Sequence, residues 1–290
     1  MTLLDGGTGR ELAQQGAPFR YPEWSALALI EAPEYVGRVH RAFIDAGADV
    51  VTSNSYAIVP FHIGDQRFAR DGARLAALAG RLAREAANQA PRKVRVAASL
   101  PPVCGSYRAD WFDANRARPV LRTLFDSLAP SADLWLGETL SCVAEAELVR
   151  EVLGADSRPL WLSFTLEDVP SAPGESRLRS GESTRDAVAA AARLGAAAVL
   201  LNCSQPEVMG DAIAVARSTP PRLAVGVYAN AFAPQGTQAQ ANTDDAALRE
   251  DVTPDAYLKF ARRWAALGAT IVGGCCGVGP EHIRLLREAL

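Results

Sequence analysis

The sequence lacks an excess of positive charge and any run of lysine or arginine. Its 30 basic and 33 acidic side chains give a formal net charge of −3, so neither nucleic acid nor an anionic membrane is an expected partner. No apolar stretch approaches the roughly 20 residues that a membrane helix needs. Only Thr2–Leu4 separate Met1 from Asp5, which is not the pattern of a signal peptide.

Cysteine is also scarce, and the chain carries no nucleotide-binding fingerprint. The five cysteines are an odd number, which argues against a disulfide framework and indicates a reducing cytoplasm. Gly6, Gly7 and Gly9 begin like a phosphate-binding GxGxxG turn, but Leu12 stands where the later glycine would be. A nucleotide site therefore has little support, and the protein is expected to be cytoplasmic.

Short apolar runs alternate with longer helical segments along the whole chain. Strands that alternate with helices pair in parallel through crossover connections. Eight such units match a closed (β/α)8 barrel, or TIM barrel, in which residues 1–290 form a single domain. A doubly wound open sheet is the competing fold, and it would usually bring the missing glycine fingerprint. The predicted strands are Leu3–Asp5, Val50–Ser53, Val94–Ser99, Leu134–Glu138, Leu160–Thr165, Ala198–Cys203, Leu223–Tyr228 and Thr270–Gly273.

The predicted helices fill the intervals between these strands. Pro33 and Pro280 fit first-turn positions, where a missing N–H costs nothing, and Gly47 fits the end of a helix. Asp168–Glu182 and Phe232–Asp251 are loop-like and are candidate lids over the barrel mouth. The predicted helices are Pro33–Ala46, Phe68–Asn88, Pro119–Leu128, Val143–Leu153, Thr184–Leu194, Glu207–Arg217, Pro254–Leu267 and Pro280–Leu290.

Three cysteines stand where predicted strands run out into turns. Cys203 ends the sixth strand, and Cys275 and Cys276 follow the eighth within Gly273–Gly277. These two strands are one strand apart around a barrel, so the three thiols should meet at its catalytic end. Three thiolates with one position left open are typical of a catalytic zinc site. A pair of buried thiols and a vicinal disulfide are the alternatives.

The remaining cysteines and histidines are not expected to bind metal. Cys104 and Cys142 follow the third and fourth strands and are interpreted as spectator thiols. His40, His62 and His282 do not fall at strand ends, so we interpret them as surface or packing residues.

Polar side chains also stand at the ends of other predicted strands. Asp5 ends the first strand, Ser53 the second and Glu138 the fourth. Such carboxylates often cap the next helix. Thr139 and Ser141 could cap the helix after the fourth strand, which would leave Glu138 for the substrate. Two carboxylates that converge beside a zinc of low net charge suit a substrate with an ammonium group.

These motifs together resemble those of the homocysteine S-methyltransferase family. The resemblance covers nearly the whole chain, and the Gly-Gly-Cys-Cys-Gly element is its most specific part. The compact length and the Trp-Ser-Ala element look closer to the branch that uses S-methylmethionine. The matching segments are Leu4–Gly9, Trp24–Ala26, Ala46–Asp49, Ser53–Tyr56, Gly137–Thr139, Asn202–Ser204 and Gly273–Gly277.

The resemblance implies a zinc-dependent (β/α)8 enzyme with two small-molecule substrates, homocysteine and a methyl donor. It implies that Zn²⁺ is held by three thiolates and that the sulfur of homocysteine takes the open position. The acting form is expected to be a monomer or small homo-oligomer. The implied zinc ligands are Cys203, Cys275 and Cys276. The implied contacts to the amino-acid end are Asp5, Glu138, the Ser53 region, and the backbone near Gly6 and Gly7.

The expected donor is a methylsulfonium, first S-methylmethionine and second S-adenosylmethionine, because no nucleotide fingerprint demands an adenosine. Trp24 and Tyr56 could face the sulfonium through cation–π attraction. The chain departs from the family pattern mainly in the loops around the donor. The departures are Arg10, Ala57, Leu100–Pro102, Ala229 and Phe232–Gly236.

Other functions remain open at this point. The acceptor could be another thiol or a selenol. A zinc hydrolase would need a general base beside a zinc-bound water, usually with histidine or carboxylate ligands. A non-catalytic zinc or thiol redox sensor would use the adjacent Cys275 and Cys276 as a switch.

Overall fold

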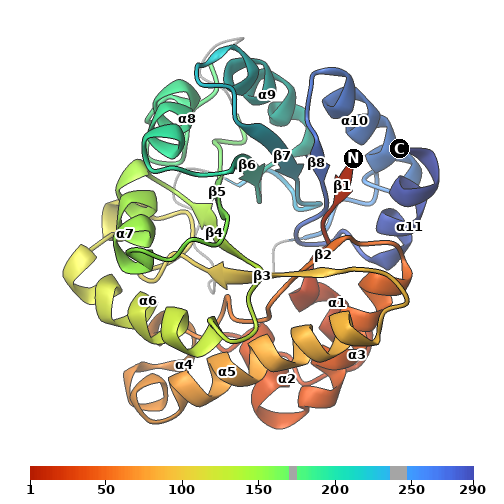
Figure 1. The fold of residues 1–290 in the computed structure, drawn as a ribbon. Coiled ribbons are helices and arrows are strands. Elements are labelled where there is room, and N and C mark those ends of the chain that lie inside the picture. The colour runs from red at the N-terminus through yellow and green to blue at the C-terminus, as the bar shows by residue number, and fades with distance from the viewer. Residues whose placement is uncertain (170–174, 236–246) are drawn as a thin grey trace.

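The computed structural model describes residues 1–169, 175–235 and 247–290. It confirms the predicted (β/α)8 barrel, in which parallel strands are surrounded by an outer ring of helices (Figure 1). The sheet runs in the order β1-β8-β7-β6-β5-β4-β3-β2, and an isolated bridge between Leu4 and Val50 brings its two edges together. The strands are β1 Thr2–Leu3, β2 Val50–Thr52, β3 Arg95–Leu100, β4 Leu134–Leu140, β5 Leu160–Phe164, β6 Ala198–Asn202, β7 Ala224–Tyr228 and β8 Ile271–Val272.

The helices follow the predicted pattern, with three additions near the amino terminus, α1, α2 and α4. The predicted helix at Pro119–Leu128 is wrong at its start, because the Asp113 side chain accepts hydrogen bonds from the N–H groups of Asn115 and Arg116 and so begins the helix earlier. The helices are α1 Thr8–Gln14, α2 Ser25–Glu31, α3 Pro33–Asp45, α4 Pro60–Ile63, α5 Asp65–Gln89, α6 Ala114–Leu128, α7 Val143–Leu153, α8 Thr184–Arg193, α9 Met209–Ser218, α10 Pro254–Ala266 and α11 Pro280–Ala289, with short 3-10 turns at Ala109–Trp111 and Pro206–Val208.

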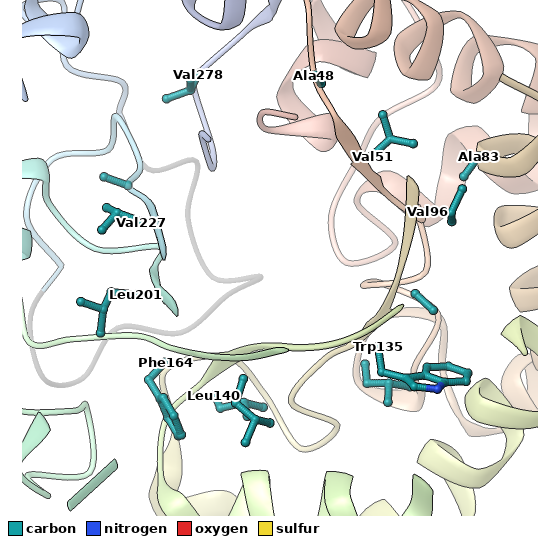
Figure 2. Packing of buried hydrophobic residues seen from close by; sticks show 14 of the residues in the cluster. Ala48, Val51, Ala83, Val96, Trp135, Leu140, Phe164, Leu201, Val227 and Val278 are labelled. Atoms are coloured by element: carbon teal, nitrogen blue, oxygen red, sulfur yellow. The ribbon is translucent and has the colours of Figure 1, made fainter. Parts of the chain in front are cut away.

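The core has an inner and an outer layer, because successive side chains of a strand point to opposite faces. On β4, Leu134 and Leu136 belong to the inner layer that fills the barrel, whereas Trp135 belongs to the outer layer beneath the helices. Figure 2 shows part of the outer layer, with Leu140 and Phe164 on the helix-facing side of their strands. The inner layer closes the bottom of the barrel, so chemistry is confined to its mouth.

The two predicted lid segments are only partly described. Residues 170–174 and 236–246 lie outside the described residues. The described part of the first segment forms isolated bridges from Leu178 to Leu166 and from Arg177 to Ser183, so it folds back beside β5. Among the described helices, none combines the length and the apolar character needed to cross a membrane.

Candidate active site

Three thiols converge at the mouth of the barrel. Cys203 follows β6, and Cys275 and Cys276 follow β8, with β7 between the two strands. The Sγ atoms of the three residues all lie within 4.8 Å of one another, and those of Cys203 and Cys275 are 2.7 Å apart. Cys203 and Cys276 are buried, at 6% and 5% exposure, and Cys275 is half-buried. The expectation that these distant cysteines meet is correct.

The backbone around the thiols is shaped for close approach. Gly277 has φ of +84°, which favours glycine, and turns the chain directly after Cys276. A side chain at Gly7 would place its Cβ 2.5 Å from the carbonyl oxygen of Cys275, so only glycine lets the first loop lie against the thiol loop. The Gly7 N–H also donates to the carbonyl of Val278, 2.9 Å away. Gly7 therefore supports the thiol loop, and its predicted contact with substrate stays a prediction.

The thiol loop is held to the neighbouring strand ends as well. The N–H of Cys275 donates to the carbonyl of Ala229, 2.9 Å away, and the hydroxyl of the fully buried Tyr257 donates to the carbonyl of Gly273 at 2.7 Å. Cys203 itself has φ of +52°, a left-handed conformation that costs energy in a residue with a side chain. The surrounding fold therefore fixes the position of the Cys203 thiol, although the backbone conformation at this residue is unfavourable.

The three sulfur atoms form a donor set that fits one zinc ion. Hydrogen bonds from Cys275 and Cys276 lower the pKa of the Cys203 thiol, and the same contacts with Cys203 raise the pKa of Cys275. Cys203 is thus the thiol that loses its proton most readily. Deprotonation of the other two thiols needs a cation that compensates the added negative charge. Zinc binds thiolates at about 2.3 Å, which places sulfur atoms of one site about 4 Å apart. The three sulfur atoms lie within 4.8 Å of one another, and those of Cys203 and Cys275, at 2.7 Å, would separate to hold the ion. Among the described residues, this is the only group of three or more potential metal ligands.

The other cysteines and the histidines lie outside this group. Burial raises the pKa of Cys142 to about 12, so its thiol stays protonated and inert. His40 is fully buried on α3, and His62 stacks against Trp24 with ring centroids 5.9 Å apart. His282 bonds to the backbone of Val252 and Gly279. These placements agree with the packing roles expected for the histidines.

Asp5 follows β1 and Glu138 lies near the carboxyl end of β4, and both carboxyl groups are buried. Asp5 accepts hydrogen bonds from the N–H and hydroxyl of Thr52, at 2.7 and 3.0 Å. Burial raises its pKa to about 7, although the bonds from Thr52 lower it. Helix α1 has no side-chain cap, so Asp5 does not serve the capping role that was its alternative. Burial likewise raises the pKa of Glu138 to about 8, against its hydrogen bond with Ser99.

A serine chain links Glu138 to the residues that follow β2. The hydroxyl of Ser53 accepts from the N–H of Ser99 and lies 2.9 Å from the hydroxyl of Ser55. The hydroxyl of Ser99 donates to Glu138. Ser53 therefore acts on the site through Ser99 in this structure, and its predicted direct contact with substrate stays a prediction.

The strand that carries Glu138 is irregular. The register of β4 against β5 shifts between Gly137 and Leu140, and Thr139 has φ of +58°. Asn202 holds this bulge by bonding both the N–H and the hydroxyl of Thr139, at 3.1 and 2.8 Å. Bulges re-aim side chains next to active sites. Because Glu138 directly precedes Thr139, the bulge sets the direction of its carboxyl group.

The expectation that Thr139 and Ser141 cap α7 is wrong. The helix begins at Val143, and its N-cap residue, Cys142, makes no side-chain capping hydrogen bond. Two glutamate side chains instead accept hydrogen bonds from backbone N–H groups at the start of α7. Glu145 accepts from the N–H of Ser141 at 2.6 Å, and Glu182 accepts from the N–H of Val143 at 3.0 Å.

Aromatic side chains surround the thiols. Trp24, Tyr107 and Phe232 pack against them, and Tyr56 meets Trp24 edge to face with ring centroids 5.7 Å apart. Trp24 and Tyr107 have φ of +50° and +68°, so both rings are presented from strained backbone, as is common at functional sites. The sequence reasoning named Trp24 and Tyr56 but missed Tyr107, whose position in a loop carries no local signal.

Two arginines lie near this rim. The guanidinium of Arg10 is 5.3 Å from the ring centroid of Phe232, and that of Arg179 is 5.0 Å from the centroid of Tyr107. Arg179 also helps to lower the pKa of Cys203, after the larger contributions of the neighbouring thiols. The fold and the site together define a barrel enzyme with a thiol centre, two buried acids and a partly aromatic rim at its catalytic end.

Comparison with known proteins identifies the family. The model of the homocysteine S-methyltransferase family matches residues 2–290. The chain belongs to the homocysteine S-methyltransferase family. It is 29% identical to homocysteine S-methyltransferase 1 of Brassica oleracea var. italica over 318 aligned residues, which cover 99% of this chain and 93% of the relative. It is 28% identical to the selenocysteine Se-methyltransferase of the same plant, over 99% and 88% of the two chains.

A solved structure agrees with this assignment. The metallated form of the homocysteine methyltransferase MmuM from Escherichia coli superposes with a TM-score of 0.77 and 28% sequence identity. The match covers 99% of this chain and 96% of that one. The family, the barrel and the methyltransferase class thus agree across sequence and structure.

Proposed function

We propose that this enzyme transfers a methyl group from a methylsulfonium donor to the thiol of homocysteine, giving methionine, with one Zn²⁺ held by Cys203, Cys275 and Cys276. The observation that carries the proposal is the convergence of these thiols, all within 4.8 Å, at the mouth of a barrel that also buries Asp5 and Glu138. Family membership makes homocysteine the first acceptor to test.

The three cysteines would hold the ion and leave one position for the acceptor. When bound, zinc supplies a Lewis-acidic position that keeps the acceptor sulfur deprotonated at neutral pH. Around that position the chain supplies a rigid support, since the loop bearing Cys275 and Cys276 is packed against Gly7 and anchored by Tyr257. A fixed sulfur position favours alignment with the methyl group, which can contribute several kcal/mol, on the order of 7–11.

Asp5 and Glu138 would bind the ammonium group of the acceptor. Their pKa values are raised to about 7 and about 8 by burial, so each carboxyl group is poorly solvated and gains from a cationic partner. The hydrogen bonds from Thr52 and Ser99 fix their orientation. This end of the site would select an α-amino acid with a thiol side chain.

The aromatic rim would hold the donor. A sulfonium near the faces of Trp24, Tyr56 and Tyr107 would be attracted to their rings by about 0.5–2 kcal/mol each at best. In the transfer, the donor S–CH₃ bond breaks and its electron pair stays on the donor sulfur. The acceptor thiolate, whose proton has passed to solvent, forms the new S–C bond. S-methylmethionine and homocysteine would thus give two molecules of methionine.

A second acceptor class has specific support. The similarity to a selenocysteine Se-methyltransferase makes a selenol an alternative acceptor for the same site. We also propose a cytoplasmic location, supported by the odd cysteine number, and action as a monomer or small homo-oligomer.

The test is methionine formation by the purified, zinc-loaded protein. Homocysteine is combined in turn with S-methylmethionine, S-adenosylmethionine and betaine, and selenocysteine is offered as a second acceptor. We expect S-methylmethionine to give the highest rate. Methionine from betaine alone would overturn the sulfonium proposal, and turnover of selenocysteine without turnover of homocysteine would change the acceptor.

A further inference from the structure

A buried ion pair joins the loops at the barrel mouth. The side chains of Arg179 and Asp168 are 3% and 0% exposed, and Nη2 of the arginine lies 2.9 Å from Oδ2 of the aspartate. Asp168 also accepts from the N–H groups of Gln205 and Gln235, at 2.8 and 2.7 Å. Arg179 is therefore held in place by the loops that follow β5, β6 and β7.

One of the three guanidinium nitrogens is left without an acceptor among the described residues. Its Nη1 donates to the carbonyl of Gln235 at 3.0 Å, and its Nη2 is used by Asp168. Nε is buried and has no acceptor among the residues that the structure describes. Burying an unpaired donor is destabilising, and more so when the group is charged. Such a donor in a catalytic mouth marks a position for a ligand acceptor.

This donor lies on the aromatic side of the thiols. The guanidinium is 5.0 Å from the ring centroid of Tyr107, and Tyr107 packs against the thiol cluster. The site thus has carboxyl groups at the ends of β1 and β4 and a guanidinium on the loop after β5. This separation of charge suits two amino-acid substrates, one held by its ammonium group at the acids and the other held by its carboxylate at the guanidinium.

We propose that Arg179 binds the α-carboxylate of the methyl donor. The inference rests on the proposed function, in which the acceptor's ammonium group lies at Asp5 and Glu138. The acceptor carboxylate is on the same carbon as that ammonium group, so it stays near those acids and not at Tyr107. In S-methylmethionine, two methylene groups and the α-carbon separate the sulfonium from the carboxylate. A carboxylate on Arg179 therefore leaves the sulfonium beside the rings.

The experiment compares two sulfonium ligands that differ only in the carboxylate. They are S-methylmethionine and its decarboxylated form, (3-aminopropyl)dimethylsulfonium. The zinc-loaded enzyme is assayed for the KM of the first and for the inhibition constant of the second against it. Removing the arginine alone leaves the buried Asp168 without a cationic partner, so the main variant is the double substitution D168N/R179Q. Arg179→Lys keeps the ion pair but loses the Nε donor.

In the double variant, we expect the KM for S-methylmethionine to rise about 10- to 150-fold, because charged hydrogen bonds contribute about 1.5–3 kcal/mol. The inhibition constant of the decarboxylated ligand, the KM for homocysteine and the zinc content should change less than about threefold. Arg179→Lys should raise the KM for S-methylmethionine in the same direction by less. Arg10→Gln, which removes the other rim cation, should not change the ratio between the two sulfonium constants.

Three results would contradict the inference in different ways. Equal losses for both sulfonium ligands would mean that Arg179 has only a structural role. A rise in the KM for homocysteine alone would move the residue to the acceptor. No methionine from the parent enzyme with homocysteine and S-methylmethionine would instead refute the proposed function itself, and the inference with it.

Discussion

Replacing Glu138 by glutamine removes one charge from the acceptor site and leaves its packing in place. The amide oxygen of Glu138→Gln can still accept from the hydroxyl of Ser99. What is lost is the charged partner of the acceptor's ammonium group. Hydrogen bonds to charged groups contribute about 1.5–3 kcal/mol, so the KM for homocysteine should rise about 10- to 150-fold.

The pH dependence gives a second signature of the same substitution. The pKa of Glu138 is raised to about 8 by burial, so the carboxyl group is largely protonated below pH 7 and must ionise to bind an ammonium group. Binding of methionine, which has no thiol to titrate, should therefore strengthen in the parent as pH rises from 6 to 8. In Glu138→Gln this rise should be much smaller, with Asp5 and its pKa of about 7 as the remaining source.

The assay is steady-state kinetics with homocysteine, together with calorimetric titration of methionine at pH 6, 7 and 8. A group whose folded pKa is raised stabilises the fold below its unfolded pKa and loses this contribution as pH rises through the folded value. Glu138→Gln should therefore fold at least as stably as the parent at pH 8. Glu145→Gln is the matched control, because Glu145 is a buried carboxyl group with pKa of about 7 that serves the start of α7. A homocysteine KM within twofold of the parent in Glu138→Gln would refute the role of this residue.

Three further predictions follow from packing and burial. His40→Leu should reduce the loss of stability between pH 7 and pH 4.5 by about 2 kcal/mol in denaturant titrations, because burial lowers the pKa of His40 from 6.5 to about 4 and mainly the unfolded chain gains the proton; an unchanged pH profile would contradict this. Gly7→Ala should weaken zinc binding about tenfold or more in a competition with a chelator, because its Cβ would lie 2.5 Å from the carbonyl of Cys275; parental affinity would show that the loop adjusts freely. Tyr56→Leu should raise the KM for S-methylmethionine about 3- to 30-fold and Tyr56→Phe much less, whereas equal effects would assign the role to the hydroxyl.

The architecture and the thiol centre could be predicted because both depend on regular strand geometry. Apolar runs separated by helical segments define parallel strands, and the carboxyl ends of such strands share one edge of the barrel. Cys203 and Cys275 could therefore be brought together although they are 72 residues apart. Asp5 and Glu138 could be found by the same reasoning, since both end predicted strands, although the structure extends β4 two residues beyond Glu138, to Leu140.

The features that the sequence did not reveal depend on contacts between distant segments. The start of α7 is capped by Glu145 and Glu182, and the bulge at Thr139 depends on Asn202. The ion pair of Arg179 joins three loops. No local sequence pattern predicts these hydrogen-bond and ion-pair partners, because loop residues that are distant in sequence come together only when the barrel has formed.

The central claim is that three cysteines form one metal centre, and zinc analysis of Cys276→Ser tests it most directly. The hydroxyl of serine is a poor substitute for a thiolate ligand. The purified parent should hold about one zinc per chain, whereas Cys276→Ser should lose most of it along with methionine formation. Cys142→Ser, which changes a buried thiol outside the cluster, should keep both. Full zinc occupancy in Cys276→Ser would contradict the account.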